Sequence, residues 1–192
     1  MAQSDVFLVC VDGKPGHEEA YAKWFCGAHM ADMRKLSGVS RAFGGRLRAL
    51  DGAPPPAQLC GYYETPDCGE LLNTIAANKG TAALPASDLQ GVMVWRVLET
   101  VGTQGEPPSS EADILICLFP GEPDTASLCA DLPVAAARLT RIGALQPARN
   151  REYSTVLFLG LPAGTDPAAI ATSVATGYGK EGARFLLASA HP

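Results

Sequence analysis

Residues 17–39, HEEAYAKWFCGAHMADMRKLSGV, decide the fold, because they predict a single amphipathic helix that carries a histidine and an aspartate. Apolar side chains recur at the helical spacing i, i+3, i+4 and i+7 and form one stripe. The members of that stripe are Tyr21, Trp24, Phe25, Ala28 and Ala31. Acidic residues occupy the first turn, where they interact favourably with the helix dipole, and Ser37-Gly38 predicts the end of the helix.

Four strand-like segments and a second helix accompany this helix in the first half of the chain. Residues 6–11 (VFLVCV) are a continuous apolar run, which is typical of a strand covered on both faces. The other predicted elements are strands over residues 39–50, 57–64 and 91–101 and a helix over residues 66–78. The order β-α-β-β-α-β is that of a ferredoxin-like unit.

The same order of elements is predicted again after residues 102–110 (GTQGEPPSS), which are rich in Gly, Pro and Ser. The predicted strands cover residues 113–119, 138–146, 153–161 and 183–190, and the predicted helices cover residues 125–137 and 166–176. We therefore expect an α+β fold of two tandem ferredoxin-like units: residues 1–102 with the candidate site, a linker over residues 103–110, and a degenerate unit over residues 111–192. Because each sheet has one face without helices, the two sheets are expected to pack together as an α+β barrel within one chain.

Composition excludes several classes of partner. Fifteen Lys and Arg against twenty Asp and Glu give a net charge of −5 with no basic cluster, so nucleic acid is not expected as a partner. No apolar run approaches the roughly 18 residues of a membrane span, and the chain is expected to be cytoplasmic. The six cysteines form no CxxC pair and are interpreted as core residues, not as disulfides or metal ligands.

Residues 18–43, EEAYAKWFCGAHMADMRKLSGVSRAF, resemble a pattern of the dimeric α+β-barrel proteins: WY, three residues, H-x-P-D, and then PG-V. These proteins include EthD-like and antibiotic-biosynthesis-monooxygenase-like families. The matching positions are Trp24, His29, Asp32, Gly38 and Val39. Phe25 stands where Tyr is often found, Met30-Ala31 replaces an aliphatic-Pro pair, and Ser37 replaces a Pro. The resemblance implies a superfamily of cofactor-independent monooxygenases, cyclases, isomerases, haem-binding enzymes and proteins of no assigned role.

His29 and Asp32 lie one turn apart on the predicted helix, and this spacing defines the candidate catalytic pair. A carboxylate beside an imidazole can fix its tautomer and raise its basicity, which would make His29 an oriented general base. The aromatic residues expected to line an apolar substrate cavity are Tyr21, Trp24, Phe43, Tyr62 and Trp95. Alternatively, His29 is a capping residue or a satisfied core histidine, Asp32 pairs with Arg34, Lys35 or Arg41, and the aromatic residues are simply core.

The leading hypothesis is a small cofactor-independent enzyme of cyclase, isomerase or monooxygenase type. Its substrate would be an apolar aromatic or polyketide-like carbonyl compound, with His29 as general base and no metal. The alternative is a non-catalytic small-molecule-binding or structural barrel protein. By analogy with the family, haem is the alternative cofactor and His29 would be its ligand. A small apolar molecule is the expected partner, and a homodimer is possible.

Overall fold

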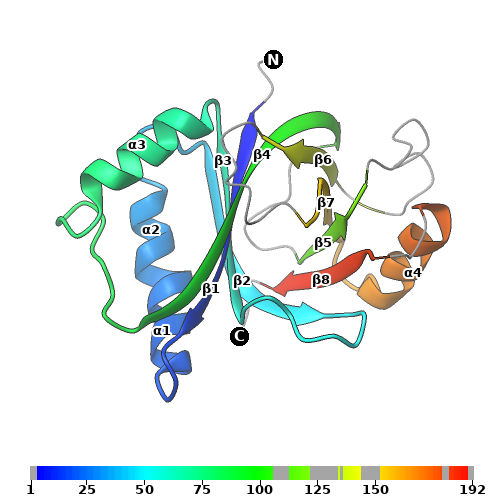
Figure 1. The fold of residues 1–192 in the computed structure, drawn as a ribbon, viewed down its shortest axis with the longest axis horizontal. Helices are drawn as coiled ribbons and strands as arrows, with labels where there is room; N and C mark the ends of the chain where they lie inside the picture. The colour runs from blue at the N-terminus through cyan, green and yellow to red at the C-terminus, as the bar shows by residue number, and fades with distance from the viewer. Residues whose placement is uncertain are drawn as a thin grey trace.

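The computed structural model shows eight antiparallel strands closed into one barrel, with helices on the outside (Figure 1). The structure describes residues 4–105, 113–121, 134, 136–143, 152–178 and 182–189. The strands of the first half are β1 (Asp5–Gly13), β2 (Arg41–Ala49), β3 (Leu59–Thr65) and β4 (Gln90–Gly105). Those of the second half are β5 (Ile114–Phe119), β6 (Ala136–Ile142), β7 (Thr155–Gly160) and β8 (Arg184–Ser189).

The strand order around the barrel is β1-β3-β2-β8-β5-β7-β6-β4. The first half therefore has the order β4-β1-β3-β2, and the second half has the equivalent order β8-β5-β7-β6. The halves are joined where β2 pairs with β8 and where β4 pairs with β6. The predicted α+β fold class and the closure of two sheets into one barrel are confirmed.

Strand β4 extends into the segment expected to link the halves. Strand β4 continues to Gly105, so residues 103–105 of the expected linker are hydrogen-bonded strand opposite β6. Residues 106–110 lie outside the described part of the chain. The division into units 1–102 and 111–192 stays a prediction, and the two halves share one continuous sheet.

The helices cover opposite sides of the barrel (Figure 1). On the first half lie α1 (Glu18–Trp24), a π-helical turn η1 (Phe25–His29), α2 (Met30–Met33) and α3 (Cys68–Asn78), and on the second half lies α4 (Pro167–Tyr178). Of the helix expected over residues 125–137, residues 125–133 lie outside the described chain and residues 136 and 137 belong to β6. No described helix is both long and apolar enough to cross a lipid bilayer.

Strand β1 is apolar on both faces because each face packs against a different core. Phe7 and Val9 pack against the helices of the first half, while Val6 and Leu8 fill the interior of the barrel. Successive side chains of a strand alternate between faces, and here both faces are covered. A third core, between the second-half sheet and α4, is also apolar.

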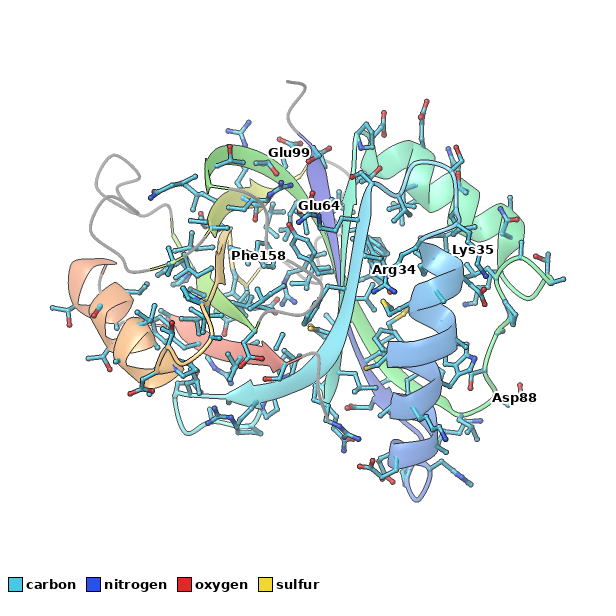
Figure 2. All side chains as sticks on the ribbon, turned by 180° about the vertical axis from the view of Figure 1, so that it is seen from behind. Arg34, Lys35, Glu64, Asp88, Glu99 and Phe158 are labelled. Atoms are coloured by element: carbon cyan, nitrogen blue, oxygen red, sulfur yellow. The ribbon has the colours of Figure 1, made fainter. Side chains whose placement is uncertain are left out.

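One buried ion pair crosses the interior of the barrel between the two halves. The guanidinium of Arg138 on β6 lies 3.4 Å from the carboxylate of Glu64 on β3, and each residue is 4% exposed. The hydroxyl of Tyr62 donates a hydrogen bond of 2.7 Å to Glu64. Figure 2 shows Glu64 and Phe158 within the barrel, on the side of β2 away from the helix that carries Arg34.

Candidate functional site

A π-helical turn in the middle of the helix sets the position of His29. The buried residues of this helix include Tyr21, Phe25, Met30 and Met33, and the step of five residues from Phe25 to Met30 spans the wide turn. Such turns add one residue to a helical turn and are frequent at functional sites. His29 is the last residue of the turn.

The aromatic surroundings of His29 are formed by the same helix. The imidazole lies 4.9 Å from the indole of Trp24 and 5.2 Å from the ring of Phe25, measured between ring centres. Ala28 and Ala31, which were expected in the apolar stripe, are exposed instead. The extra residue of the π-turn rotates the following helix and brings Met30 and Met33 to the buried face in their place.

His29 borders a cavity of about 120 Å³ between the helices and the outer face of the first-half sheet. Most of its lining is aromatic or aliphatic. The residues of the lining that carry polar side-chain groups are Tyr21, Trp24, His29, Tyr63, Lys79 and Gln90. The cavity is thus an apolar chamber with a few polar groups, the usual form of a site for a small molecule.

The loop between α3 and β4 closes one side of this cavity. Lys79, Leu84 and Pro85 contribute to the lining. Leu84 is 4% exposed and anchors the loop, because its carbonyl accepts a hydrogen bond of 2.9 Å from the amide of Gly80.

Burial keeps His29 neutral. Loss of hydration lowers the pKa of His29 from 6.5 to about 4, and the nearby negative charge of Asp32 opposes part of this shift. The Nδ1 atom is buried and has no hydrogen-bond partner among the described residues. The Nε2 atom lies 3.5 Å from the hydroxyl of Tyr63, at the long end of the hydrogen-bond range.

Asp32 does not contact His29 in the way the candidate pair requires. Its carboxylate accepts a hydrogen bond of 2.9 Å from Lys35, one of the alternative partners left open by the sequence. Arg34 instead donates to the backbone carbonyl of Ala42 on β2, at 3.1 Å from Nη2. Figure 2 shows Arg34 and Lys35 at the C-terminal end of this helix. The effect of Asp32 on His29 is therefore electrostatic.

The structure brings together some of the predicted aromatic residues and separates others. Tyr21 and Trp24 line the cavity beside His29. Phe43 and Tyr62 belong to the core inside the barrel, on the opposite face of the sheet, so they cannot line this cavity. Trp95 packs against Phe7 in the same layer as the cavity, with ring centres 5.8 Å apart, but does not border the cavity.

Tyr63 lines the cavity, although it was not among the aromatic residues selected as substrate-binding. It follows Tyr62 on β3, and alternation places the two side chains on opposite faces of the sheet. The ring of Tyr63 folds back over Gly61, where a Cβ atom would collide with the tyrosine hydroxyl. The glycine two residues before Tyr63 is the one local signal that could have pointed to it.

A second, wider groove runs along the surface between α1 and the barrel. Its volume is about 560 Å³, and its borders include Glu19, Lys23, Cys26 and Arg46. Arg46 and Glu19 form an ion pair of 2.6 Å there. The groove is larger than the cavity beside His29, but Arg46 and Glu19 already neutralise each other there. No histidine lines the groove among the described residues, so we place the candidate site at His29.

Comparisons with known proteins show similarity at the level of the fold. No family model matches the chain, and no curated protein matches it. A candidate chlorite dismutase of known structure has a TM-score of 0.56 at 8% identity, covering 98% of this chain and 95% of that one. A candidate monooxygenase from Lactobacillus acidophilus has a TM-score of 0.55 at 10% identity, covering 98% and 97%. A mutant chlorite dismutase from Candidatus Nitrospira defluvii has a TM-score of 0.51 at 10% identity, covering 98% and 92%.

The expectation of a cofactor-free protein is wrong as an inference from the fold. The structures that share this fold include chlorite dismutases, which are haem b enzymes. The cavity beside His29 nevertheless does not fit a haem. Its volume of about 120 Å³ has room for at most one six-membered ring and not for the four pyrrole rings of a haem. We therefore assign His29 no role as a haem ligand.

Similarities below 25% identity establish architecture and not activity. The α+β-barrel part of the predicted resemblance is confirmed, whereas the EthD-like resemblance and the tandem repeat stay predictions. The chain has an α+β-barrel fold shared with chlorite dismutase-like and monooxygenase-like proteins.

Proposed function

We propose that this chain is a monooxygenase-type enzyme that acts on a small aromatic or polyketide-like carbonyl compound in the cavity beside His29. The observation that carries the proposal is a neutral imidazole in an otherwise apolar cavity, next to a buried tyrosine hydroxyl. A convergence of few polar groups with a strongly shifted pKa is the usual physical signature of a reactive site. The architecture shared with a candidate monooxygenase is consistent with the proposal.

The size of the cavity limits what can enter it. An apolar cavity of roughly 150 Å³ accommodates benzene, so a cavity of about 120 Å³ has room for at most one six-membered ring, either a whole small ligand or one end of a larger molecule. The remainder of a larger substrate would extend past the rim, where Lys79 and Gln90 lie. The aromatic lining from Tyr21 and Trp24 favours a flat, apolar ring.

His29 is proposed as the general base. With a pKa of about 4 the imidazole is unprotonated at pH 7 and available to accept a proton. The same low pKa makes it a weak base, so removing a proton from an enol, a phenol or a carbon between two carbonyls also requires a hydrogen-bond donor that stabilises the resulting anion. Asp32, whose charge favours the imidazolium, supports this role from a distance.

Oxygen uptake with a panel of hydroxylated acetophenones tests this function. We expect uptake with at least one compound and a loss of about 10²-fold or more in His29→Gln, the contribution typical of a general base. Asp32→Asn should lower the rate less, because its carboxylate acts only through charge. Full activity of His29→Gln would remove His29 from the reaction.

A non-catalytic binding protein is the second candidate, and one observation favours it. Asp32 bonds Lys35 and leaves His29 without an orienting carboxylate. This alternative predicts that aromatic compounds shift the NMR signals of His29 while no compound of the panel is consumed.

A further inference from the structure

Tyr63 and His29 together present two hydrogen-bonding atoms at one edge of the cavity. Both residues belong to its lining, and the tyrosine hydroxyl and Nε2 are 3.5 Å apart. Tyr63 is 1% exposed, and His29 is the one hydrogen-bond partner recorded for its hydroxyl among the described residues. The two atoms come from different elements, β3 and the π-helical turn.

The arrangement of hydrogen-bond donors indicates which nitrogen of His29 carries the proton. A buried hydroxyl must donate to an acceptor, and Nε2 is the acceptor within reach. If Tyr63 donates to Nε2, the imidazole proton resides on Nδ1 and one donor is left unpaired. If Nε2 donates instead, the hydroxyl proton of Tyr63 has no acceptor and Nδ1 has no donor. The first arrangement leaves fewer unpaired atoms, so Nε2 is the unprotonated nitrogen.

We propose that Tyr63 is a second catalytic residue and that the pair it forms with His29 selects ligands with an acidic hydroxyl group, a phenol or an enol. This inference rests on the proposed function. An oxygen atom about 2.8 Å from each of the two atoms completes a triangle with their 3.5 Å separation. In that position a hydroxyl group donates to Nε2 of His29 and accepts from the hydroxyl of Tyr63.

The same geometry describes a proton transfer. The O–H bond of the ligand breaks, its electron pair stays on the oxygen as a phenolate or enolate, and the proton moves to Nε2. Tyr63 then donates to the oxyanion, as donors do in an oxyanion hole. Burial raises the pKa of Tyr63 well above its ordinary value, which keeps the tyrosine protonated as a donor.

Gly61 is the residue that makes this arrangement possible. A Cβ atom at this position would collide with the hydroxyl end of the Tyr63 ring. The ring could then not lie along β3 with its hydroxyl near Nε2. Gly61 is thus a positioning residue that acts through Tyr63.

Phenol and toluene are the probes for this inference, because they differ only by a hydroxyl in place of a methyl group. Their affinities for the full-length protein are measured by ligand-observed NMR. We expect phenol to bind at least as tightly as toluene, although phenol loses more hydration on entering an apolar cavity. The preference for phenol is the affinity for phenol divided by the affinity for toluene. In Tyr63→Phe this ratio should fall about tenfold, the effect of one lost hydrogen bond.

Tyr62→Phe is the matched control, since it removes a hydroxyl from the neighbouring residue of β3, whose side chain lies inside the barrel and away from the cavity. It should leave the preference for phenol unchanged. Imidazole ¹⁵N shifts of the ligand-free protein provide a readout without any ligand. They should show Nε2 unprotonated in the wild type and a changed tautomer balance in both Tyr63→Phe and Gly61→Ala.

The outcomes separate this inference from the proposed function. The inference would be overturned if Tyr63→Phe kept the preference for phenol, or if the His29 imidazole of the wild type carried its proton on Nε2. The cavity would still be the proposed ligand site in either case. Failure of both phenol and toluene to bind would overturn the proposed function and the ligand class with it.

Discussion

A single imidazole held neutral in an apolar layer is the most informative residue of this protein. His29 lies among Trp24, Phe25 and Tyr63, and its Nδ1 has no partner among the described residues. A buried, incompletely paired polar group costs free energy in the folded state. A histidine that is present despite this loss of stability indicates a functional role, and for this reason we place the site at His29.

Protonation of His29 should destabilise the folded protein. Its pKa is about 4 when folded and 6.5 when unfolded, so between these values the unfolded state binds more protons. The free energy of unfolding should be unaffected by this group above pH 6.5 and fall by about 3 kcal/mol as the pH drops toward 4. Urea unfolding of the wild type and of His29→Gln across this range checks it. The difference between the two proteins should depend on pH, and parallel curves would contradict the assignment.

The sequence could predict part of the site at this scale. His29, Trp24 and Tyr21 belong to one helix, and their spacing alone groups them. Tyr62 and Tyr63 are adjacent and chemically identical, and apart from Gly61 nothing in the local sequence indicates which of them faces the helices. That choice is made by the register of β3 with β1, a contact between segments about 50 residues apart, where Tyr62 pairs with Leu8 and Tyr63 with Phe7.

At the scale of elements, the π-helical turn explains the largest error in the sequence analysis. A helical wheel assumes 3.6 residues per turn throughout, and one wide turn shifts every later residue on the wheel. Ala28 and Ala31 therefore moved to the surface, and Met30 and Met33 became buried. The buried residues of the strands were predicted more accurately. A strand covered on both faces is recognised from a continuous apolar run, and no helical periodicity has to be assumed.

The fit of the helix onto the sheet can be tested at Gly44 on β2. A Cβ atom there would lie 2.6 Å from Cγ and 2.9 Å from Sδ of Met30, which follows the π-turn. Gly44→Ala should lower the free energy of unfolding by about 1–3 kcal/mol through overpacking. Gly27→Ala is the control within the turn itself. Its added methyl meets nothing within 4 Å, so it should be neutral or stabilise by up to about 1 kcal/mol.

Thermal unfolding of both glycine variants measures this difference. If the two alanine variants were equally stable, the close contact between β2 and Met30 would not constrain the helix. The NMR signals of His29 should move in Gly44→Ala, because displacement of Met30 reaches the neighbouring residue.

At the scale of the whole molecule, the two halves depend on one another inside the barrel. Arg138 of the second half meets Glu64 of the first, and the same guanidinium donates to the backbone carbonyl of Ser4 at 3.2 Å. A buried charge without its partner is very costly, whereas removing both charges costs much less. The pair therefore helps to specify how the halves meet.

Arg138→Met should lower the free energy of unfolding by about 3–5 kcal/mol, because Glu64 is left buried without its ion-pair partner. The double variant Arg138→Met with Glu64→Gln should recover much of that loss. Arg46→Met removes the exposed partner of Glu19, whose side chain is 84% exposed, and should cost no more than about 1 kcal/mol. Guanidinium unfolding compares the three. If Arg138→Met and Arg46→Met lowered the free energy of unfolding equally, Arg138 would not be needed to neutralise Glu64 inside the barrel.

The pairing of β2 with β8 has a consequence for how the chain folds during translation. Arg46 pairs with Ser189, so about 140 residues must be synthesised after β2 before its outer neighbour exists. At the usual rate of protein synthesis this takes on the order of ten seconds. Throughout that interval β2 presents an open edge to other nascent chains. Arg48 places a positive charge on this strand, whereas Arg46 pairs with Glu19. A charge of this kind discourages edge-to-edge association, so we expect Arg48 to disfavour pairing between growing chains until β8 has been made.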